Sequence, residues 1–462
     1  LYTTLTTMAA FGSLTASQIV PVEDFGWMMC IGIAIGFLVS FTFYPAVLML
    51  LPLAPAKALQ IRELGMTRVF SRVARWQSGW VIVFSTVWVA AVVIGLMAVS
   101  LDNRFIDYFK ADTDINQGMR FIDAELGGTV PFDVIIKFSP FADFADEDDF
   151  FAEEEPDPYP ERYWFTRDKL DKVETIHRYM ASRDEVGKVL SLTSLEDLAR
   201  EFTDGERLSN LEIVAVLDVL PEDLRAELIA PYASPGTGEV RLSARVIESG
   251  PHFDRGQLAQ AVREYAHSAA GLATDVVEVT GMMILFDGML RQLFTSQIDT
   301  LAYVLLATFA MFVILLRSVL YAVLGLIPNI IAAASVIALM GYLGIPLDMM
   351  TITIAAISIG IGVDDAMHYL HRFASEYRKD SDVRLSVAWS HATIGRAMYF
   401  TSITIILGFS VLVFSNFVPT MLFGLLTAAA MALAMIANLT LLPALLVLVL
   451  GGPRKTMEDV VA

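Results

Sequence analysis

Long apolar stretches alternate with short polar connections along this chain, and one long polar region interrupts them. A helix needs roughly 20 predominantly apolar residues to cross a bilayer. On this basis the sequence predicts eight membrane spans, at residues 1–16, 25–51, 80–100, 298–316, 320–343, 349–372, 397–415 and 421–449. The first stretch is shorter than the others, and we expect it to be a span that is cut short.

The polar region between residues 102 and 297 combines short β-type runs with helical periodicity. The pattern predicts strands at 131–138, 187–193, 239–248 and 275–280, helices at 167–182 and 254–270, and helical turns near 195–202, 208–218 and 221–229. The order of the main elements, βαββαβ, is that of the ferredoxin-like split βαβ unit. We therefore expect a polytopic α-helical membrane protein with an α+β ferredoxin-like domain outside the bilayer.

Residues 141–161, FADFADEDDFFAEEEPDPYPE, interrupt this polar region. Acidic residues alternate with phenylalanine until prolines break the run, which is typical of a solvated loop. A partner-binding segment is a second interpretation. A calcium loop is a third, although the ligand spacing and turn glycine of an EF-hand are absent.

Composition places the chain in the membrane-embedded class, because 55% of its 462 residues are hydrophobic. The net charge of −19 is concentrated in residues 102–299, and the rest of the chain is nearly neutral. Such acidity argues against nucleic acid as a partner of the polar region. Cys30 is the only cysteine, so an internal disulfide is excluded.

The charges of the short connections predict the orientation of the spans. Lys and Arg gather in residues 52–79, at Arg317, in residues 372–396 and in the tail 451–462, whereas residues 17–24, 344–348 and 416–420 contain neither. By the positive-inside rule the basic connections are cytoplasmic. The acidic region then lies on the outer side, in the periplasm of a bacterial inner membrane.

Two adjacent carboxylates, Asp364 and Asp365, interrupt the span 349–372. A charge in the hydrocarbon costs at least about 2.5–3.5 kcal/mol, so such residues face a bundle interior or a water-filled cavity and mark a functional site. Two neighbouring carboxylates do not both ionise cheaply, and we expect the pair to hold a proton. His368 lies one turn further on the same side. The sequence therefore predicts a proton relay of these three residues.

Two other interpretations of this span remain open: a hydrated helix end, and a metal site. Gly360 and Gly362 precede the carboxylates by about one turn and let another helix approach closely. His371 and Arg372 are expected at the cytoplasmic helix end. Since no Cys/His cluster or phosphate-binding glycine loop is present, we expect no metal, no cofactor and no ATP hydrolysis.

The chain contains an internal repeat, in which residues 1–51 align with residues 399–449 without a gap. Proline and glycine that match in register are harder to obtain by chance than apolar residues. The matched pairs are Thr3 and Thr401, Thr6 and Thr404, Phe11 and Phe409, Pro21 and Pro419, Phe25–Gly26 and Phe423–Gly424, and Pro45–Ala46 and Pro443–Ala444. Both copies have the same topology, as in transporters built from parallel halves.

The motifs GIGVDDAMHYLHRF, FTSITIILGF, VPTMLFGLL and LTLLPALL resemble the resistance-nodulation-division (RND) superfamily. The branch that the motifs most resemble is that of the mycobacterial large membrane proteins (MMPL), the hopanoid transporters and Patched. The resemblance implies a proton-driven exporter of lipids and other hydrophobic compounds, with a relay between the fourth and tenth spans. It also implies that the hydroxyls of Thr401, Ser402 and Thr404 are relay partners, although such residues commonly bond their own helix carbonyls.

The resemblance further implies how the chain is divided. Residues 1–51 would be the last two spans of a first repeat, 52–79 a cytoplasmic linker, 80–101 the first span of a second repeat, 102–297 a periplasmic porter-like domain, 298–450 a five-span bundle and 451–462 a cytoplasmic tail. The chain would be the C-terminal portion of a twelve-span protein. The helices expected to face the carboxylates would then be absent.

Two functional classes remain open, and a third is set aside. The first is a proton-coupled exporter, whose partners are protons, membrane lipids, a lipid-like substrate and, as further expectations, a second copy and periplasmic accessory proteins. The second is a sterol-sensor or Patched-like lipid receptor in which the carboxylates are structural. An intramembrane aspartyl protease fits poorly, because its Gly-x-Gly-Asp spacing is missing, and we expect no enzyme.

Overall fold

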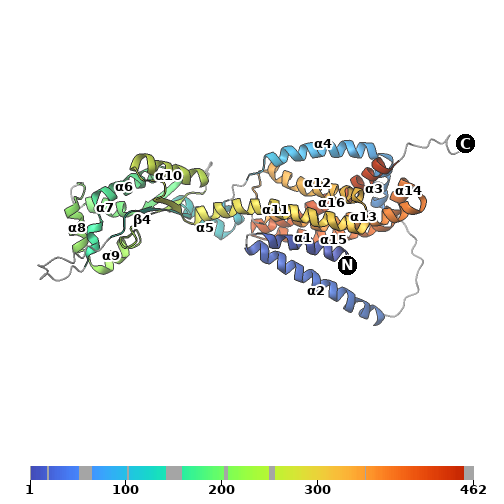
Figure 1. Ribbon diagram of the computed structural model, residues 1–462, viewed down its shortest axis with the longest axis horizontal. Helices are drawn as coiled ribbons and strands as arrows, with labels where there is room; N and C mark the ends of the chain where they lie inside the picture. Colours follow the sequence, from blue (N-terminus) through green and yellow to red (C-terminus); the bar gives the residue numbers. More distant parts are fainter. Residues whose placement is uncertain are drawn as a thin grey trace. The chain divides into compact units, whose positions relative to one another are not determined.

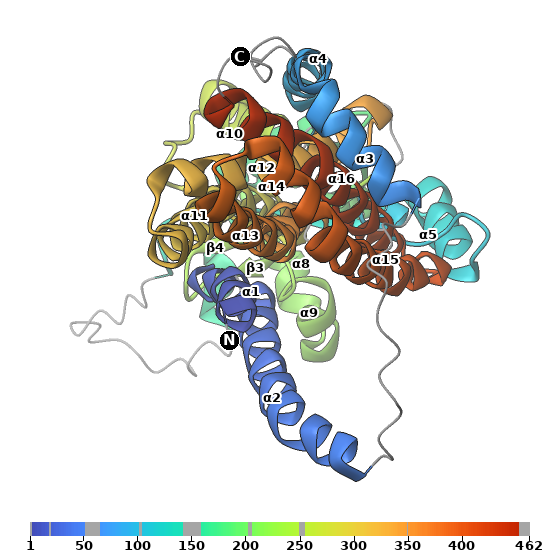
Figure 2. The ribbon, with the colours of Figure 1, turned by 90° about the vertical axis from the view of Figure 1, so that its right-hand side faces the viewer.

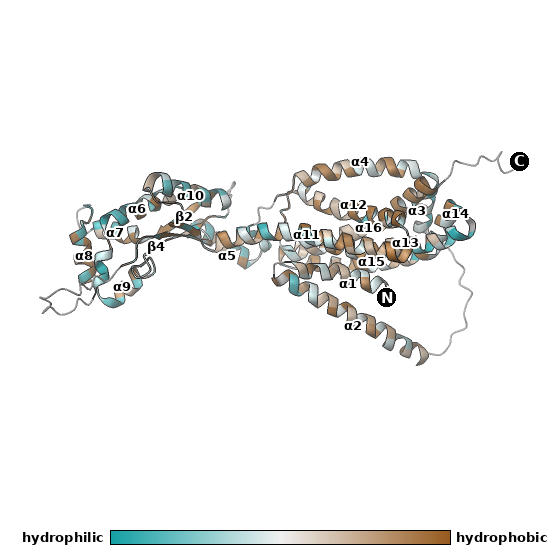
Figure 3. Cartoon of the chain, viewed as in Figure 1, coloured by the Kyte–Doolittle hydropathy of each residue, from teal (hydrophilic) through white to brown (hydrophobic). Residues whose placement is uncertain are grey.

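The computed structural model describes residues 2–17, 20–50, 65–100, 104–141, 159–201, 206–248, 255–348 and 350–451. The chain forms two compact units, one of Leu1–Asn103 with Leu290–Ala462 and one of Arg104–Met289. We call them the membrane unit and the sheet unit (Figure 1). Hydrophobic residues dominate the helices of the membrane unit, whereas hydrophilic residues are frequent on the helices of the sheet unit (Figure 3).

Helices make up the membrane unit. Its long helices are α2 (Val20–Leu50), α4 (Ser78–Met97), α11 (Met282–Leu316), α12 (Val319–Leu343), α13 (Ile354–Asp380), α15 (Arg396–Ser410) and α16 (Val418–Leu450). Its shorter segments are α1 (Tyr2–Ser13), η1 (Leu14–Ala16), α3 (Gly65–Trp76), η4 (Thr351–Thr353), α14 (Val383–Ser390), the π-helix η5 (His391–Gly395) and η6 (Val411–Phe414).

Within the described residues, six helical stretches are long and apolar enough to cross a membrane. They are Val22–Leu50, Ser78–Met97, Met282–Leu316, Val319–Leu343, Val383–Phe414 and Val418–Leu450. Of the eight predicted spans, 1–16 and 349–372 are missing from this set. Both are helical nevertheless: α1 has only 12 residues, and α13 contains the aspartates, histidines and arginine that lower its hydropathy.

The predicted polar connection 372–396 is mostly helical. Helix α13 continues to Asp380, and α14, η5 and α15 follow without a break from Val383. Ser381 has a φ of 52°, which turns the chain. The side chain of Asp382 then caps α14 by accepting hydrogen bonds from the backbone amides of Arg384 and Leu385. The connection between the helices is therefore a tight corner.

The centre of the membrane unit consists of α12 and α16, which pack against each other and are both contacted by α13 and α4. More than half of the most apolar window of each is buried, 61% for α12 and 56% for α16. Helix α1 packs against α13 and α2. Figure 2 shows α2 starting beside α1 and leading away from the other helices of the unit.

The internal repeat is present in the helix boundaries. The segments α1, η1 and α2 correspond in order and type to α15, η6 and α16. The starts of α2 and α16, Val20 and Val418, are separated by the alignment offset of the repeat. We call these two segments the first and second hairpins.

The sheet unit contains all four predicted strands. Its elements are η2 (Phe105–Tyr108), α5 (Asp114–Glu125), β1 (Val130–Lys137), η3 (Pro160–Trp164), α6 (Arg167–Ala181), β2 (Val186–Leu190), α7 (Leu192–Arg200), α8 (Asn210–Val219), α9 (Glu222–Leu228), β3 (Ala233–Ser234), β4 (Glu239–Val246), α10 (Arg255–Ala270) and β5 (Val277–Thr280). Helix α5 and the short strand β3 were not predicted. Residues 142–158, most of the predicted acidic loop, lie outside the described residues.

The strand order is β2-β4-β1-β5, and every pair is antiparallel. Strand β1 is central and pairs Val134 with Leu242 of β4. Helices α6 and α10 pack together through the rings of Tyr179 and Tyr265, whose centroids lie 3.9 Å apart. The side chains that β1 turns to the core, among them Phe132, are fully buried. This alternation gives the unit its own hydrophobic core.

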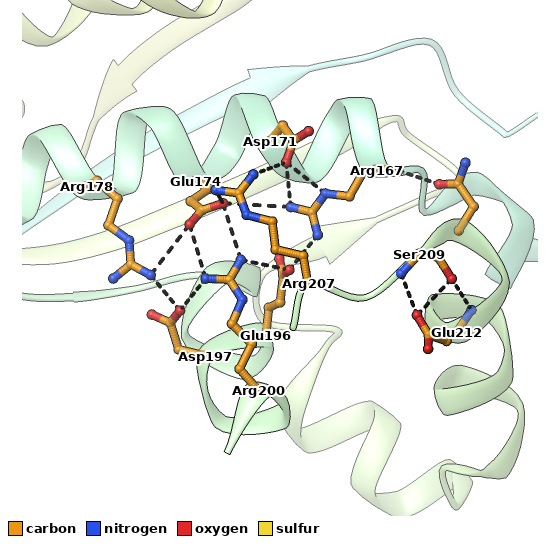
Figure 4. Close-up of polar contacts among 11 residues, drawn as sticks. Arg167, Asp171, Glu174, Arg178, Glu196, Asp197, Arg200, Arg207, Ser209 and Glu212 are labelled. Atoms are coloured by element: carbon orange, nitrogen blue, oxygen red, sulfur yellow. Dashed lines mark hydrogen bonds and ion pairs between the residues drawn. The ribbon is translucent and has the colours of Figure 1, made fainter. Parts of the chain in front are cut away.

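An ion-pair network ties α6 to α7 (Figure 4). The carboxylate of Glu196 accepts Arg167 at 2.5 Å and Arg200 at 3.0 Å. Arg200 also lies 3.4 Å from Glu174 of α6. Because Glu174 and Glu196 are nearly buried, each charge requires these guanidinium partners.

Candidate functional site

Helix α13 carries both carboxylates of the predicted relay, and each is only half-buried. Consecutive residues on an α-helix point about 100° apart, since 3.6 residues make one turn. Asp364 and Asp365 therefore face different neighbours. Asp364 faces α1 of the first hairpin, and Asp365 faces α15 of the second, as their hydrogen bonds show.

Hydroxyl groups of α1 surround Asp364. The Thr6 hydroxyl contacts Oδ1, and the Thr7 hydroxyl lies 3.0 Å from Oδ2. Both hydroxyls also lie 2.8 Å from the Thr3 carbonyl of their own helix, so each is shared between that carbonyl and the carboxyl group. One turn away, the Thr3 hydroxyl lies 2.9 Å from Nε2 of His368, which is itself exposed. Thr6 is completely buried, so its hydroxyl is held against the carboxylate by packing. One short helix thus supplies hydrogen bonds to two members of the predicted relay.

Asp365 is bonded from the second hairpin. The hydroxyl of the buried Ser402 donates to Oδ2 of Asp365 at 2.8 Å. Of the three predicted hydroxyl partners, Ser402 alone forms this contact. Thr401 donates to the carbonyls of Ala397 and Met398 in its own helix, and Thr404 donates to that of Phe400. The structure therefore does not bring Thr401 and Thr404 to the carboxylates.

Close helix approach at two glycines brings these donors within reach. A Cβ on Gly360 would collide with the Cβ of Ala10 in α1. A Cβ on Gly362 would lie 2.6 Å from the side-chain oxygen of Asn329 in α12. Glycine lets helix backbones approach in this way. The predicted packing glycines thus face α1 and α12, respectively.

A buried pair of amides lies behind the carboxylates. Asn438 of α16 donates to the side-chain oxygen of Asn329 at 3.0 Å and to the carbonyl of Gly362 at 3.2 Å. Asn329 also donates to the carbonyl of Gly325 at 3.0 Å. Because buried amides without partners are costly, this pair fixes the rotation of α13 against α12 and α16.

No positive side chain neutralises the carboxylates: neither Asp364 nor Asp365 forms an ion pair with a described Lys, Arg or His. Their described side-chain partners are neutral hydroxyls. A carboxylate in an apolar environment that lacks a counter-charge is neutralised by taking up a proton. The arrangement can therefore bind and release protons at two adjacent positions.

The sequence interpretation did not predict that α1 faces this site. It expected the facing helices to be absent, but α1 covers Asp364 with two threonines. The signal was present in the repeat, which aligns Thr3 and Thr6 with two of the predicted hydroxyl residues. Asn329 and Asn438 were also missed, although an amide within an apolar span is itself a sign of a buried polar contact.

Comparisons with known proteins find a family match for part of this chain. Residues 249–459 match the model of the MMPL family. "Putative membrane protein MJ1562" of Methanocaldococcus jannaschii is 26% identical over 273 residues, which are 57% of this chain and 67% of that protein. "Putative membrane protein SCO6666" of Streptomyces coelicolor is 30% identical over 235 residues, 48% of this chain and 32% of that protein.

Two solved structures share the fold. The hedgehog release protein Disp of the water bear Hypsibius dujardini superposes with a TM-score of 0.58 at 15% identity, over 98% of this chain and 58% of that one. SecDF, a translocon-associated membrane protein of Thermus thermophilus, gives a TM-score of 0.50 at 14% identity. This match covers 97% of this chain and 47% of that one. The chain thus spans about half the length of these two proteins. Together with the match of residues 249–459 to the MMPL family model, the shared fold confirms the resemblance that the motifs of α13, α15 and α16 predict.

Proposed function

Residues 249–459 of this chain form an MMPL family domain, and from this premise we propose that the protein is a proton-driven secondary exporter of RND type. It moves lipids or other hydrophobic and amphiphilic compounds across or out of the inner membrane. The observation that carries the proposal is the pair Asp364 and Asp365, each bonded by hydroxyls from a different hairpin.

Proton coupling follows from the way the two carboxylates are held. Protonation of Asp364 or Asp365 removes a charge that the described residues do not neutralise. It also changes how the carboxyl group meets its hydroxyl partner, since a protonated carboxyl group can donate a hydrogen bond. Because α1 and α15 each hold one carboxylate, a change of protonation alters the contact of each hairpin with α13. Such a change is what couples a proton gradient to movement of one half of a transporter.

The proposed orientation puts the sheet unit in the periplasm. The basic residues near α3 and between α13 and α15 favour a cytoplasmic location for those segments. The strand order β2-β4-β1-β5, with α6 and α10 as its two crossover helices, supports a ferredoxin-like unit. In this reading the sheet unit is a periplasmic porter-like domain.

A cavity in the sheet unit supports the proposal that the substrate is hydrophobic. Its volume is about 340 Å³, and its lining is almost entirely apolar. The lining comes from α6, α7, α8 and α9 and includes Leu170, Leu195, Ile213 and Leu217. Pockets of this size and character bind apolar groups such as hydrocarbon chains.

A lipid receptor is the second candidate function. A cavity of about 490 Å³ among α3, α4, α12 and α16 favours it. Trp88 donates to Ser335 at 2.8 Å at its wall, so the cavity combines aromatic surface with a polar anchor. A receptor would bind lipid with equal affinity whether or not a proton gradient is present, and an exporter would move it only with the gradient.

The test is proton flux in everted membrane vesicles from cells that express the protein, with a pH-sensitive dye as the reporter. Asp364→Asn and Asp365→Asn should each abolish substrate-dependent proton flux, because an amide cannot carry the proton. Asp24→Asn, at an exposed position in the second turn of α2, is the matched control and should leave flux unchanged. Wild-type flux in both α13 variants would refute the proposal.

A further inference from the structure

Two titratable side chains that the predicted relay does not include are completely buried beyond Asp365. They are Tyr369 of α13 and His391, the first residue of the π-helix η5, and both have zero exposure. The Tyr369 hydroxyl lies 3.0 Å from Nδ1 of His391. The two rings meet edge to face, with centroids 5.3 Å apart. Burying the polar atoms of a tyrosine and a histidine costs free energy unless they form hydrogen bonds, and these two side chains bond each other.

A proline in α16 explains the hydrogen bond that one ring nitrogen of His391 forms. In an α-helix the carbonyl of Leu439 would accept from the amide of residue 443, which is a proline and has no N–H. His391 Nε2 lies 3.0 Å from this carbonyl. A carbonyl can only accept, so Nε2 carries a proton and donates it. This bond stabilises α16 and requires no titration.

The other ring nitrogen has partners for both of its protonation states. His391 Nδ1 lies 3.0 Å from the Tyr369 hydroxyl and 3.0 Å from the carbonyl of Val387. In the neutral ring, Nδ1 accepts from the tyrosine hydroxyl. In the charged ring, Nδ1–H donates to the Val387 carbonyl or to the tyrosine oxygen. His391 can therefore take up a proton at Nδ1 without losing a hydrogen bond.

Tyr369 lies one helical turn from the relay. Asp365 and Tyr369 are i, i+4 neighbours on α13, on the same face and separated along the axis by about 6 Å. The helix continues from there towards its basic end. We propose that Tyr369 and His391 form the cytoplasmic continuation of the proton path from Asp365, a role that rests on the proposed function of the carboxylates.

The transfer is balanced in protons. The Asp365 carboxyl group releases its proton through water to the oxygen of Tyr369 while the tyrosine passes its own proton to Nδ1 of His391. The products are an ionised Asp365, an unchanged tyrosine and an imidazolium. The imidazolium then loses the Nδ1 proton to a water that reaches the buried pair from the basic end of the helix, which restores the neutral ring.

Charged groups on the helices that pack against η5 favour release of that proton. The guanidinium of Arg75, on α3, lies close enough to Tyr369 to act on it electrostatically, and α3 packs against η5. Glu376 of α13 is paired with Arg372 and Lys379. Arg384 of α14 lies over the ring of Trp76, and Arg396 of α15 lies over the ring of Phe400. Helix α16 contributes no charged residue. A nearby positive charge disfavours a lasting imidazolium, so the proton passes through rather than resting there.

The test uses the same everted vesicles with two variants and two matched controls. Tyr369→Phe removes one oxygen and keeps the ring, and His391→Gln keeps an N–H donor for the Leu439 carbonyl but cannot titrate. Both should lower proton flux about 10²-fold, the lower end of what a positioned proton-transfer group contributes. The controls are Tyr377→Phe on the same helix and His371→Gln at an exposed position, and both should keep wild-type flux.

A second readout separates transfer from packing. If His391 transfers protons, the residual flux of His391→Gln should lose its dependence on pH around the range where histidine titrates, and Tyr369→Phe should lose its solvent isotope effect. Loss of flux with an unchanged pH profile in His391→Gln would overturn the inference. So would wild-type flux in Tyr369→Phe and His391→Gln while Asp365→Asn is inactive, and this result would leave the proposed function standing. Wild-type flux in Asp365→Asn and Asp364→Asn would instead refute the proposed function itself.

Discussion

The two hairpins of the membrane unit have the same internal contacts. A Cβ on Gly26 would lie 2.8 Å from the carbonyl oxygen of Phe11, and a Cβ on Gly424 would lie 2.6 Å from that of Phe409. Phe11 and Phe25 meet edge to face at 6.0 Å, and Phe409 and Phe423 do so at 5.9 Å. The repeat in the sequence is therefore a repeat of packing, and each hairpin is held by the same short set of residues.

The surroundings of the two hairpins differ. In the most apolar window of α16, 56% of the residues are buried, whereas in that of α2 none is. Helix α16 packs against α12, α13, α4 and α3, while α2 packs against α1 and η1. Equal internal packing thus leaves the role of a hairpin open, and its neighbours decide whether it forms the core of the unit or its edge.

The hairpins also meet the carboxylates differently. Helix α1 reaches Asp364 through Thr6 and Thr7, whereas α15 reaches Asp365 through Ser402. Thr6 bonds a carbonyl of its own helix as well as Asp364, whereas the described hydrogen bond of Thr404, its repeat equivalent, is to its own helix. Equivalent hydroxyls are therefore used only where the local helix rotation turns them towards α13. This contrast can be tested by paired substitutions at equivalent positions.

The largest effect is expected from Gly424→Val compared with Gly26→Val. At Gly424 the new side chain meets Leu412 and a carbonyl, and α16 cannot move because other helices enclose it. We expect a loss of about 3 kcal/mol, the upper end of typical overpacking costs. At Gly26 the edge helix α2 can shift, so the loss should be smaller. Thermal unfolding in detergent, followed by fluorescence-detected size exclusion, measures both, and equal losses would contradict the asymmetry.

The next effect concerns Thr6→Val compared with Thr404→Val. Valine keeps the shape and removes the hydroxyl, so Thr6→Val deletes a hydrogen bond to a group that ionises. Such bonds contribute about 1.5–3 kcal/mol, and proton flux should fall roughly 10- to 100-fold. Thr404→Val removes only a bond to its own helix and should keep wild-type flux. The comparison fails if both variants are equally active in vesicles.

The smallest effect is expected from Asn438→Ala compared with Ser40→Ala at the equivalent position of the first hairpin. Asn438 is fully buried, and its removal leaves the Asn329 oxygen and the Gly362 carbonyl without this donor. The stability loss should be about 1–3 kcal/mol. Ser40 is exposed, so its alanine variant should be neutral. Chemical denaturation in mixed micelles checks both, and a stable Asn438→Ala protein would show that the amide pair does not hold α13.

Much of the fold could be predicted because its signals are local. Strand β1 places Phe132, Val134 and Ile136 on its core face, and the sequence predicted it within one residue at each end. The connection 372–396 was predicted to be a polar loop because its arginines mark a water-exposed segment. Exposure does not exclude a helix, however, and α14 begins with a good aspartate cap. Helix α5 was missed for the same reason, since its residues are largely polar.

The sequence by itself determined that the chain is membrane-embedded, that residues 1–51 repeat as 399–449, and that Asp364 and Asp365 are the unusual charges in a span. These conclusions depend on hydropathy, periodicity and the cost of a charge in hydrocarbon, which are properties of single segments. Only the tertiary structure decided that Thr6 and Ser402 hold the carboxylates, while Thr401 and Thr404 do not. It also decided that Tyr369 meets His391. The physical reason is that the rotation of one helix against another depends on close contacts such as Gly360 with Ala10, which involve residues far apart in the chain.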